Sequence, residues 1–364
     1  MVTPRRRTAK YYPVARTAHL ERLHDFSPAV FFYTASRLDF DMDRAPVGTA
    51  IVQCSVFDML RRVYRDRIET LEVPEPMVMT QWPQLITVHA TVALWKMFGL
   101  RRVSLVSYCI ENYPVHLKVA IKLRTTERVA RILARGVVYF LLSTTERVAF
   151  GTEDSRRTYE DLVSGPLERI VENELVWALP RARSVAREQG EGVVFLGTFE
   201  DRKGIGCLME AWPHVVREAP SARLTILGMG GRLEAVRRFA ASTPSVELLV
   251  CPPRTRIFEE LDRAKALVLF SQPTSRWKEQ VGLPLLEGLS FGCEIVASDE
   301  TGVSCWLASH GHQVLEHTAQ ATALARGIRQ ALVSTRSKKT ILSSLPAEDG
   351  RIVADHYLFQ CEDV

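Results

Sequence analysis

Short apolar segments rich in β-branched residues alternate with longer amphipathic segments along most of this chain. The short segments have the length of strands and are apolar on both faces, which is typical of a parallel sheet covered by helices on both sides. The predicted strands are residues 28–36, 49–55, 76–82, 102–108, 136–143, 192–198, 222–228, 246–250, 266–270 and 294–298. The predicted helices are residues 56–68, 84–98, 113–135, 153–164, 203–218, 231–242, 255–263, 283–291 and 318–333. This alternation predicts an α/β fold.

The alternation falls into two series, separated by a connector without clear periodicity at residues 173–190. With 364 residues the chain is also long enough for two domains. We therefore predict two doubly wound, Rossmann-like domains at residues 1–172 and 173–345, followed by a last helix within residues 346–364. Ligands of such sheets bind beyond the carboxyl ends of the strands, so the expected site is a central cleft between the two domains.

Composition and charge exclude several classes of protein. Hydrophobic residues make up 46% and charged residues 24% of the chain, as in ordinary globular proteins. The net charge of +5 is too small to indicate a nucleic-acid partner. No long uncharged apolar segment is present, and the basic first residues lead into no apolar stretch, so neither a membrane span nor a secretory signal is predicted. We expect a cytoplasmic protein.

Positive charge is concentrated in one segment. Residues 116–136 hold six lysines and arginines and a single acid, Glu127. Apolar residues recur there at helical spacing, so residues 117–135 are predicted to form an amphipathic basic helix. Such a helix can rest on anionic lipid head groups, which would place a peripheral protein at the inner face of the plasma membrane. The alternative is a solvated helix face beside the core of the first domain.

The segment 278–298 carries the strongest chemical signal. Its predicted helix is apolar on nearly every side and is therefore expected to be buried, yet Glu287 lies in the middle of it. A buried carboxylate needs a hydrogen-bonding ligand, such as a ribose diol, or a cationic partner. Gly282 precedes the helix, where free backbone N–H groups can bind an anion or a sugar oxygen, and Glu279 lies in the loop just before it. The alternative is a glutamate flanking the helix and a core glutamate paired with an arginine.

A second signal follows the first strand of the second series. Arg202 and Lys203 open a predicted helix at the carboxyl end of this strand, where cations and a helix N-terminus favour a bound phosphate. The segment is not a Walker A loop, because position 202 is not glycine and no Ser or Thr follows Lys203. The alternative is an ordinary surface loop, in which lysine and arginine are common.

A third signal is the glycine-containing turn in TILGMGGRLEAV. Its glycines, Gly230 among them, permit a tight turn after a strand and the close approach of a ligand. The segment lacks the third glycine of a dinucleotide fingerprint, which disfavours a nicotinamide cofactor.

Together these motifs resemble the group 1 retaining glycosyltransferases of GT-B fold. The resemblance covers about residues 192–335 and rests on the spacing between Glu279 and Glu287, the upstream RKG, the TILGMGG turn and the downstream GCEIVASD. It implies that Glu287 holds the ribose of a nucleotide and that Glu279 contacts the donor sugar. It also implies that the last helix, within residues 346–364, packs back onto the first domain.

The same resemblance implies a wider donor site. Backbone groups near Gly282 would meet sugar hydroxyls and phosphate, and Lys203 would neutralise the diphosphate. Many members carry arginine after the glycine of the first strand, where this chain has Thr198, so Arg202 would supply the second cation. The predicted donor-binding residues are Thr198, Arg202, Lys203, Gly230, Val281, Gly282, Leu283 and Glu287.

The first domain is less typical of the family. Many members carry a histidine where this chain has Glu111 and Asn112. Glu111 is therefore a candidate for orienting the acceptor or the donor, and the alternative is that it caps the helix beginning near Pro114. His89 and His116 are weaker candidates for residues that line the cleft. Each is more typical of a histidine that packs in the core or lies at the surface.

The resemblance implies a hexosyltransferase that moves a sugar from a nucleotide-diphosphate sugar to a hydroxyl of a glycan or lipid-linked acceptor, with retention, in glycan or cell-envelope polysaccharide biosynthesis. The catalytic candidates are Glu279, Glu111 and Lys203. Cations and a helix dipole would stabilise the leaving diphosphate, so no cofactor or metal is expected, and DFDMD at 39–43 is not expected to bind one. The alternatives are a sugar-nucleotide epimerase or phosphorylase of the same fold, and a non-catalytic nucleotide-binding or scaffold protein.

Overall fold

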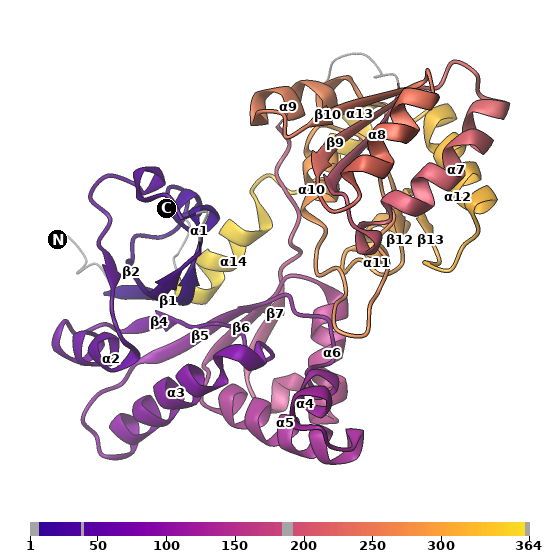
Figure 1. The fold of residues 1–364 in the computed structure, drawn as a ribbon. Coiled ribbons are helices and arrows are strands. Elements are labelled where there is room, and N and C mark those ends of the chain that lie inside the picture. The colour runs from indigo at the N-terminus through magenta and orange to yellow at the C-terminus, as the bar shows by residue number, and fades with distance from the viewer. Residues whose placement is uncertain (1–6, 38–39, 184–191, 361–364) are drawn as a thin grey trace. The chain divides into compact units, whose positions relative to one another are not determined.

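The computed structural model of the chain describes residues 7–37, 40–183 and 192–360. The chain divides into an N-terminal unit, Met1–Trp177 with Arg351–Val364, and a C-terminal unit, Ala178–Gly350. Each unit is built on one parallel sheet with helices packed against it (Figure 1). None of the helices in the described ranges is long and apolar enough to cross a membrane.

The sheet of the N-terminal unit has the strand order β3-β2-β1-β4-β5-β6-β7, and every neighbouring pair is parallel. Its strands are β1 (Thr8–Ala15), β2 (Val30–Ser36), β3 (Ile51–Gln53), β4 (Thr70–Glu72), β5 (Ser104–Cys109), β6 (Arg147–Phe150) and β7 (Glu172–Leu175). Its helices are α1 (Thr17–Arg22), α2 (Val56–Arg65), α3 (Trp82–Met97), α4 (Val115–Leu123), α5 (Glu127–Ser143), α6 (Glu153–Val163) and α14 (Gly350–Phe359), with short turns η1 (Met42–Arg44), η2 (Met79–Gln81) and η3 (Leu167–Arg169).

Helices cover both faces of this sheet (Figure 1). On one face, apolar side chains of α2, α3 and α5 form a core with β1 and β5, and α4 and α6 extend that layer. On the other face, α1 packs on β1 and β2, while Ala354 and Leu358 of α14 pack against Val106 and Ala149. The last described helix therefore completes the core of the N-terminal unit, and residues 361–364 of the predicted tail lie outside the described part of the chain.

The sheet of the C-terminal unit has the order β10-β9-β8-β11-β12-β13 and is also parallel throughout. Its strands are β8 (Val193–Thr198), β9 (Leu224–Met229), β10 (Val246–Val250), β11 (Ala266–Leu269), β12 (Glu294–Ser298) and β13 (Gln313–Leu315). Its helices are α7 (Ile205–Glu218), α8 (Leu233–Ser242), α9 (Arg254–Arg263), α10 (Leu283–Ser290), α11 (Ser304–Ser309), α12 (Ala321–Val333) and α13 (Lys338–Ser343), with the short turn η4 (Asp201–Lys203).

Two predicted strands are wrong. Residues 136–143 form the second half of α5, where Val138, Leu141 and Leu142 are buried at helical spacing and Tyr139 is exposed. Residues 76–82 form a loop and the short turn η2 before α3, and the strand of that region is β4, a few residues earlier. An apolar run of strand length does not by itself distinguish a strand from a helix, and the β-branched residues misled the prediction.

The predicted helix at 113–135 is two helices. It breaks at Arg124, which adopts a left-handed conformation with φ of 51° at the end of α4, and Thr126 then caps α5 by accepting a hydrogen bond from the N–H of Val129. Several elements were not predicted at all: β1, β4, β6, β7, β13, α1, α11 and α13. Apart from β1, each of them is at most six residues long, so their periodicity is too short to read.

Candidate functional site

The C-terminal unit brings Lys203 and Glu279 into direct contact. Lys203 ends η4 just after β8, and Glu279 lies in the loop after β11. The two strands are neighbours in the sheet, so both segments leave its carboxyl edge side by side. The ammonium group of Lys203 forms an ion pair with the carboxylate of Glu279, and the hydroxyl of Ser271 donates a second hydrogen bond of 3.0 Å to the same carboxylate oxygen.

A glycine permits this close approach. Gly204 adopts φ of 74°, and a Cβ at this position would collide with the carbonyl oxygen of Phe270 at the end of β11. A side chain here would push η4 away from β11 and separate Lys203 from its partner. Glu279 is itself buried, with 7% of its surface exposed, and Lys203 and Ser271 are among the groups that compensate for the burial of its carboxylate.

Trp277 provides a platform for both cations of this segment. The guanidinium carbon of Arg202 lies 4.6 Å from the centre of the Trp277 ring, and the ammonium nitrogen of Lys203 lies 5.2 Å from it. Arg202 also pairs with Glu200 at 2.6 Å. The two predicted cations are therefore held together at the carboxyl edge of the sheet, where they can neutralise a diphosphate.

Glu287 is half-buried and pairs with an arginine. Its Oε1 accepts a hydrogen bond of 3.0 Å from Arg254, whose side chain is mostly exposed. The arginine partner anticipated as the alternative is therefore present. Its Oε2 accepts no hydrogen bond from the side chains in the described ranges, which leaves one carboxylate oxygen for a ligand hydroxyl.

The helix that carries Glu287 is less buried than predicted. Leu285 and Leu289 are fully buried, but Leu283 is 60% exposed, so the prediction that α10 is buried on nearly every side is wrong. Helix α10 packs on the inner strands β11 and β12, and only its first residue, Leu283, is strongly exposed. Leu283 is the first residue of α10, so its backbone N–H has no partner within the helix.

The loop before α10 is held by hydrogen bonds to the segment after β12. The hydroxyl of Thr301 donates to the carbonyl of Val281 at 3.1 Å, and the N–H of Gly302 lies within hydrogen-bonding distance of the carbonyls of Glu279 and Gln280. Gly282 begins α10 with φ of 76°. This arrangement directs the N-terminal end of α10 toward the same edge of the sheet as Lys203.

Thr198 and Gly230 lie at the same edge, at the ends of β8 and β9. Thr198 is the last residue of β8 and is exposed. Gly230 follows β9 and packs directly on the backbone of Phe199, which leaves no room for a Cβ. Arg232 and Asp201 form an ion pair between the two loops. All the predicted donor-binding residues are therefore found along one edge of the C-terminal sheet.

The third catalytic candidate, Glu111, belongs to the N-terminal unit. It follows β5 and is buried, and its carboxylate accepts hydrogen bonds from the N–H of Tyr113 at 3.1 Å and from Lys118 at 2.9 Å. Pro114 is the N-cap residue of α4 and makes no side-chain cap, so Glu111 orders its own loop rather than capping that helix. The resulting arrangement is an ion pair at the carboxyl edge of the N-terminal sheet.

A second buried carboxyl group, Glu75, lies directly behind Glu111. Its Oε2 accepts hydrogen bonds of 2.9 Å from the N–H groups of Ile110 and Glu111 and one of 3.3 Å from the hydroxyl of Tyr159. Burial, together with the charge of Glu111, raises the pKa of Glu75 to about 8. Glu75 therefore holds the backbone that carries Glu111.

The two histidine candidates have different surroundings. His89 is buried in α3, where its Nδ1 lies 2.7 Å from the hydroxyl of Thr144, and burial lowers its pKa to about 3. It is a packed histidine. His116 begins α4, and its Nε2 lies 3.2 Å from Arg131 and 3.3 Å from Glu127. It lines a pocket in the helical layer of the N-terminal unit.

The residues best placed to ligate a metal ion lie outside the predicted site. Asp299, Glu300 and His317 offer ligand atoms within 4.8 Å of one another. The imidazole Nδ1 of His317 lies 3.3 Å from Asp299 and 3.2 Å from Glu300, so ion pairing already accounts for this group. In DFDMD, Asp39 lies outside the described residues, and Asp41 caps η1.

Sequence reasoning missed Ser271, Trp277, Arg254 and Glu75. A tryptophan among the polar residues of QPTSRWKEQ was a visible signal, because a large aromatic residue in a loop needs something to pack against. Ser271, Arg254 and Glu75 give no such signal in the sequence. Each of them takes part in the site only by contacting another residue of the site in the folded chain.

Comparison with known proteins gives the site a context. Residues 180–341 match the sequence profile of the family described as glycosyl transferases group 1. A phosphatidyl-myo-inositol mannosyltransferase of Mycobacterium tuberculosis is 30% identical over 124 residues, which cover 30% of this chain and 29% of the mannosyltransferase. The match thus spans less than a third of that relative.

Solved structures resemble the chain over nearly its whole length. The lipopolysaccharide outer core galactosyltransferase WaaB, in its apo form, has a TM-score of 0.67 at 11% identity and covers 97% of this chain and 98% of its own. HepE of Anabaena in complex with UDP has a TM-score of 0.63 at 13% identity and covers 97% of each chain. WaaG, a glycosyltransferase involved in lipopolysaccharide biosynthesis, has a TM-score of 0.56 at 13% identity, over 98% and 94%.

At these identities the likeness shows the fold. The chain has the GT-B fold, with two Rossmann-like α/β units, and the prediction of this fold is confirmed. The resemblance to group 1 glycosyltransferases is confirmed for residues 180–341, the segment that holds Lys203, Glu279 and Glu287.

Proposed function

We propose that this protein is a glycosyltransferase that moves a sugar from a nucleotide-diphosphate sugar to an acceptor hydroxyl. The observation that carries the proposal is the contact between Lys203 and Glu279 at the edge of the C-terminal sheet, inside the segment that matches group 1 glycosyl transferases. The mannosyltransferase relative and the UDP-bound HepE structure support the same class of donor.

The residues divide the work between the two ends of the donor. Lys203 and Arg202 neutralise the diphosphate, and Glu287 accepts a hydrogen bond from the ribose through its free Oε2. The backbone of Val281, Gly282 and Leu283 meets the sugar and phosphate oxygens at the start of α10. Glu279 contacts the donor sugar once the diphosphate has drawn Lys203 away from it.

Electrostatic stabilisation of the leaving group drives the reaction. The bond between the anomeric carbon and the phosphate oxygen breaks, and the nucleoside diphosphate leaves with additional negative charge. Lys203, Arg202 and the dipole of α10 stabilise that charge, which is the work that a metal ion would otherwise do. The acceptor hydroxyl attacks from the same face and gives its proton to the departing phosphate oxygen, so the anomeric configuration is retained.

Glu111 is proposed to orient the acceptor. It holds a buried negative charge at the edge of the N-terminal sheet, with Lys118 beside it, and can accept a hydrogen bond from a hydroxyl group. We place the acceptor in glycan or cell-envelope polysaccharide biosynthesis, on the strength of the lipid-linked and lipopolysaccharide-related names among the similar proteins.

A binding experiment tests the donor site. Titration of the protein with UDP, GDP and ADP by calorimetry is expected to single out one nucleotide, and the Glu287→Ala variant should bind it about 10-fold more weakly because a charged hydrogen bond is lost. The matched control is Glu234→Ala, which removes an exposed glutamate of α8 that pairs with Arg237. If no nucleotide binds, or if both variants weaken binding equally, the donor site is misplaced.

Turnover separates the proposal from its alternatives. A transferase supplied with its donor releases nucleoside diphosphate as acceptor is consumed, a sugar-nucleotide epimerase changes the sugar, and a binding or scaffold protein does neither. Release of nucleoside diphosphate with a product of retained configuration is the expected result.

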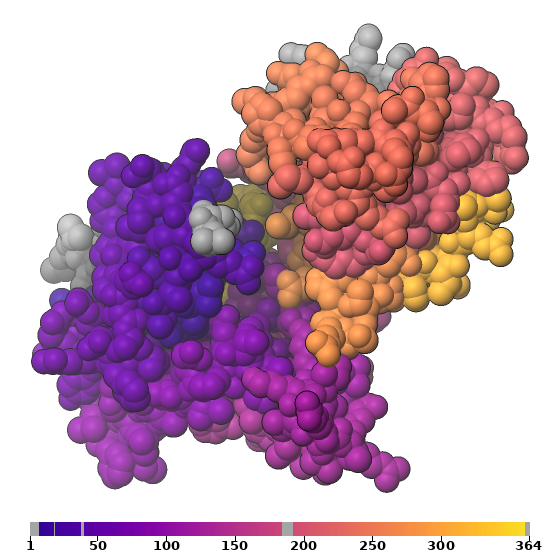
Figure 2. Space-filling model, viewed as in Figure 1, coloured from indigo at the N-terminus to yellow at the C-terminus, as the bar shows by residue number. Residues whose placement is uncertain are grey.

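We also propose that helices α4 and α5 rest on an anionic membrane. Their outer surface combines basic residues with exposed apolar side chains, among them Leu123 and Ile132, which are 56% and 71% exposed. Figure 2 shows this segment, in magenta, at the surface of the N-terminal unit. Lys118 does not belong to this surface, because it pairs with Glu111. This would place the protein at the inner face of the plasma membrane.

Vesicle flotation tests this surface. Replacing Lys122, Arg124 and Arg128 by glutamine is expected to lower binding to anionic vesicles by about 100-fold, since each basic residue near such a surface contributes about 1 kcal/mol. Raising the salt concentration should weaken binding of the unmodified protein but change the variant less. Equal binding by both proteins would contradict the membrane contact.

A further inference from the structure

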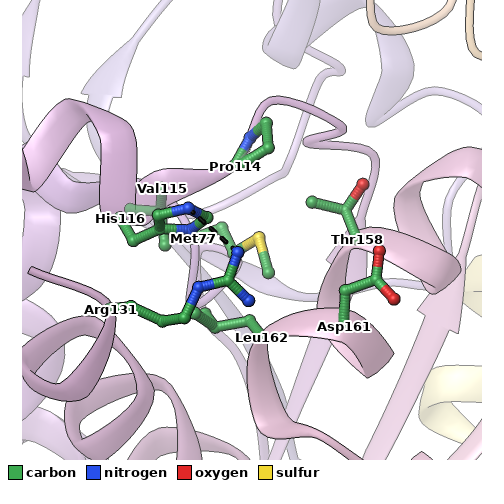
Figure 3. A pocket seen from close by; sticks show the side chains of 8 residues that line it. All are labelled: Met77, Pro114, Val115, His116, Arg131, Thr158, Asp161 and Leu162. Atoms are coloured by element: carbon green, nitrogen blue, oxygen red, sulfur yellow. Dashed lines mark hydrogen bonds between the residues drawn. The ribbon is translucent and has the colours of Figure 1, made fainter. Parts of the chain in front are cut away.

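A small pocket lies in the helical layer of the N-terminal unit, between helices α4, α5 and α6. It is lined by Met77, Pro114, Val115, His116, Arg131, Thr158, Asp161 and Leu162 and holds about 330 Å³ of space, including its open mouth (Figure 3). Its walls come from α4, α5, α6 and the loop after β4.

Two opposite charges face this pocket without pairing. Figure 3 shows the guanidinium of Arg131 on one side and the carboxylate of Asp161 on the other. Within the described part of the chain, Arg131 hydrogen-bonds to His116, whereas Asp161 has neither an ion pair nor a side-chain hydrogen bond. An arginine and an aspartate that share a pocket but do not neutralise each other offer an anion site and a cation site at once.

A buried imidazole adds a third polar group. His116 is 5% exposed, and its Nδ1 has no hydrogen-bond partner among the described residues. Its Nε2 either accepts from Arg131 or donates to Glu127, and in both cases Nδ1 is left over. Burial, and then the charge of Arg131, lowers the pKa of His116. A buried polar atom without a partner indicates a missing ligand or water.

We propose that this pocket binds a zwitterionic phosphate ester with a primary ammonium group, the chemistry of phosphoethanolamine. The phosphate lies against Arg131 and His116, the ammonium group donates to Asp161, and the apolar side chains of Met77, Val115 and Leu162 form the floor. Arginine is well suited to phosphate because its planar fork of N–H groups matches the phosphate oxygens.

Exposed apolar side chains lie on the helix that carries Arg131. Arg131 lies on α5 directly before Ile132 and Leu133, which are 71% and 47% exposed. These side chains lie on other faces of the same helix, so an exposed apolar surface is present on α5 although it does not line the pocket. The same chemistry can come from a lipid head group or from a free phosphate ester, and the experiment distinguishes them.

The experiment compares primary and quaternary ammonium groups. Phosphoethanolamine and phosphocholine are titrated against the protein by calorimetry, and flotation is measured with phosphatidylcholine vesicles that contain or lack phosphatidylethanolamine. Both lipids have no net charge, so general attraction to anionic surfaces does not contribute. We expect phosphoethanolamine chemistry to bind and phosphocholine to bind at least about 10-fold more weakly, because its ammonium group has no N–H to donate to Asp161.

Two variants and a matched control locate the site. Arg131→Gln and Asp161→Asn are both expected to weaken this binding by about 10-fold or more, whereas Arg135→Gln removes an exposed charge of the same helix outside the pocket and should leave it unchanged. All three residues are exposed, so the variants should fold.

The results distinguish a free phosphate ester, a lipid head group and the absence of a site. Binding of free phosphoethanolamine supports a soluble ligand, and binding of phosphatidylethanolamine vesicles alone, with the same dependence on Arg131 and Asp161, supports a lipid head group. Absence of both, or an equal loss with Arg135→Gln, overturns the proposal. No nucleotide sugar is needed, so the result is independent of the proposed transferase activity.

Discussion

Replacing Lys203 by methionine is expected to weaken binding of the nucleoside diphosphate by about 10- to 100-fold, because a hydrogen bond to a charged group contributes about 1.5–3 kcal/mol. Lys203 is one of two cations held at the carboxyl edge of the C-terminal sheet, stacked over Trp277. Binding of the corresponding nucleoside monophosphate should change much less, since it lacks the second phosphate. Calorimetry with both nucleotides measures the difference.

The partner of Lys203 should respond in the opposite direction. Glu279 pairs with Lys203 in the free protein and would have to release it to the proposed diphosphate, so Glu279→Gln is expected to leave the affinity for the diphosphate unchanged or to raise it. The same variant should lower turnover, because Glu279 is proposed to contact the donor sugar. A matched control is Arg217→Gln, an exposed residue of α7. If Lys203→Met leaves diphosphate binding intact, the phosphate site lies elsewhere.

Replacing Lys10 by methionine is expected to cost the N-terminal unit about 3–5 kcal/mol of unfolding free energy, the usual cost of breaking a buried ion pair. Lys10 in β1 is fully buried, lies 2.7 Å from Glu72 and also pairs with Asp355 of α14. Arg351 completes the cluster by pairing with Glu72. Without Lys10, two buried carboxylates share one cation.

A second substitution should restore much of that loss. The double variant Lys10→Met with Asp355→Leu leaves Glu72 paired with Arg351, so the buried charges balance again. We expect it to be more stable than Lys10→Met alone, with a residual loss from the hydrogen bond that the N–H of Ser27 donates to Asp355 at 2.9 Å. Urea unfolding, followed by hydrogen exchange in α14, measures both. A double variant as unstable as the single one would contradict the charge-balance argument.

The same cluster predicts a dependence on pH. Burial alone raises the pKa of Glu72, but Arg351 and Lys10 overcome this effect and hold the pKa at about 2, below the ordinary value of 4.5. Because the pKa is lower in the folded state, the contribution of Glu72 to stability is fully present above about pH 4.5 and is lost as the pH falls toward 2. The Lys10→Met variant should therefore show a smaller loss of stability over this range.

Local pattern explains which parts of the fold could be predicted. Five of the six strands of the C-terminal sheet are apolar runs bounded by turn residues, and they were predicted within a few residues of their ends. β1 was missed because it carries Lys10, a charged residue that normally marks a surface. The burial of Lys10 depends on Glu72 and Asp355, which lie 62 and 345 residues away.

The candidate site was predictable in part for the same reason. The spacing between Glu279 and Glu287 is local and was visible, but the ion pair between Lys203 and Glu279 joins residues 76 apart. It exists because β8 lies next to β11 in the sheet although two strands separate them in sequence. The partner of Glu287, Arg254, was likewise hidden, since it comes from a different helix.

The sequence alone determined the class of fold, two parallel α/β units in series, because strand and helix periodicity is a property of neighbouring residues. It also determined the chemical character of the proposed donor site, through glutamates, cations and glycines at recognisable spacings. Only the tertiary structure decided which charged side chains are buried and which groups pair with them, as for Lys10, Glu75 and Glu279. The energy of a buried charge depends on partners that the order of strands brings together, and that order is set by packing over the whole chain.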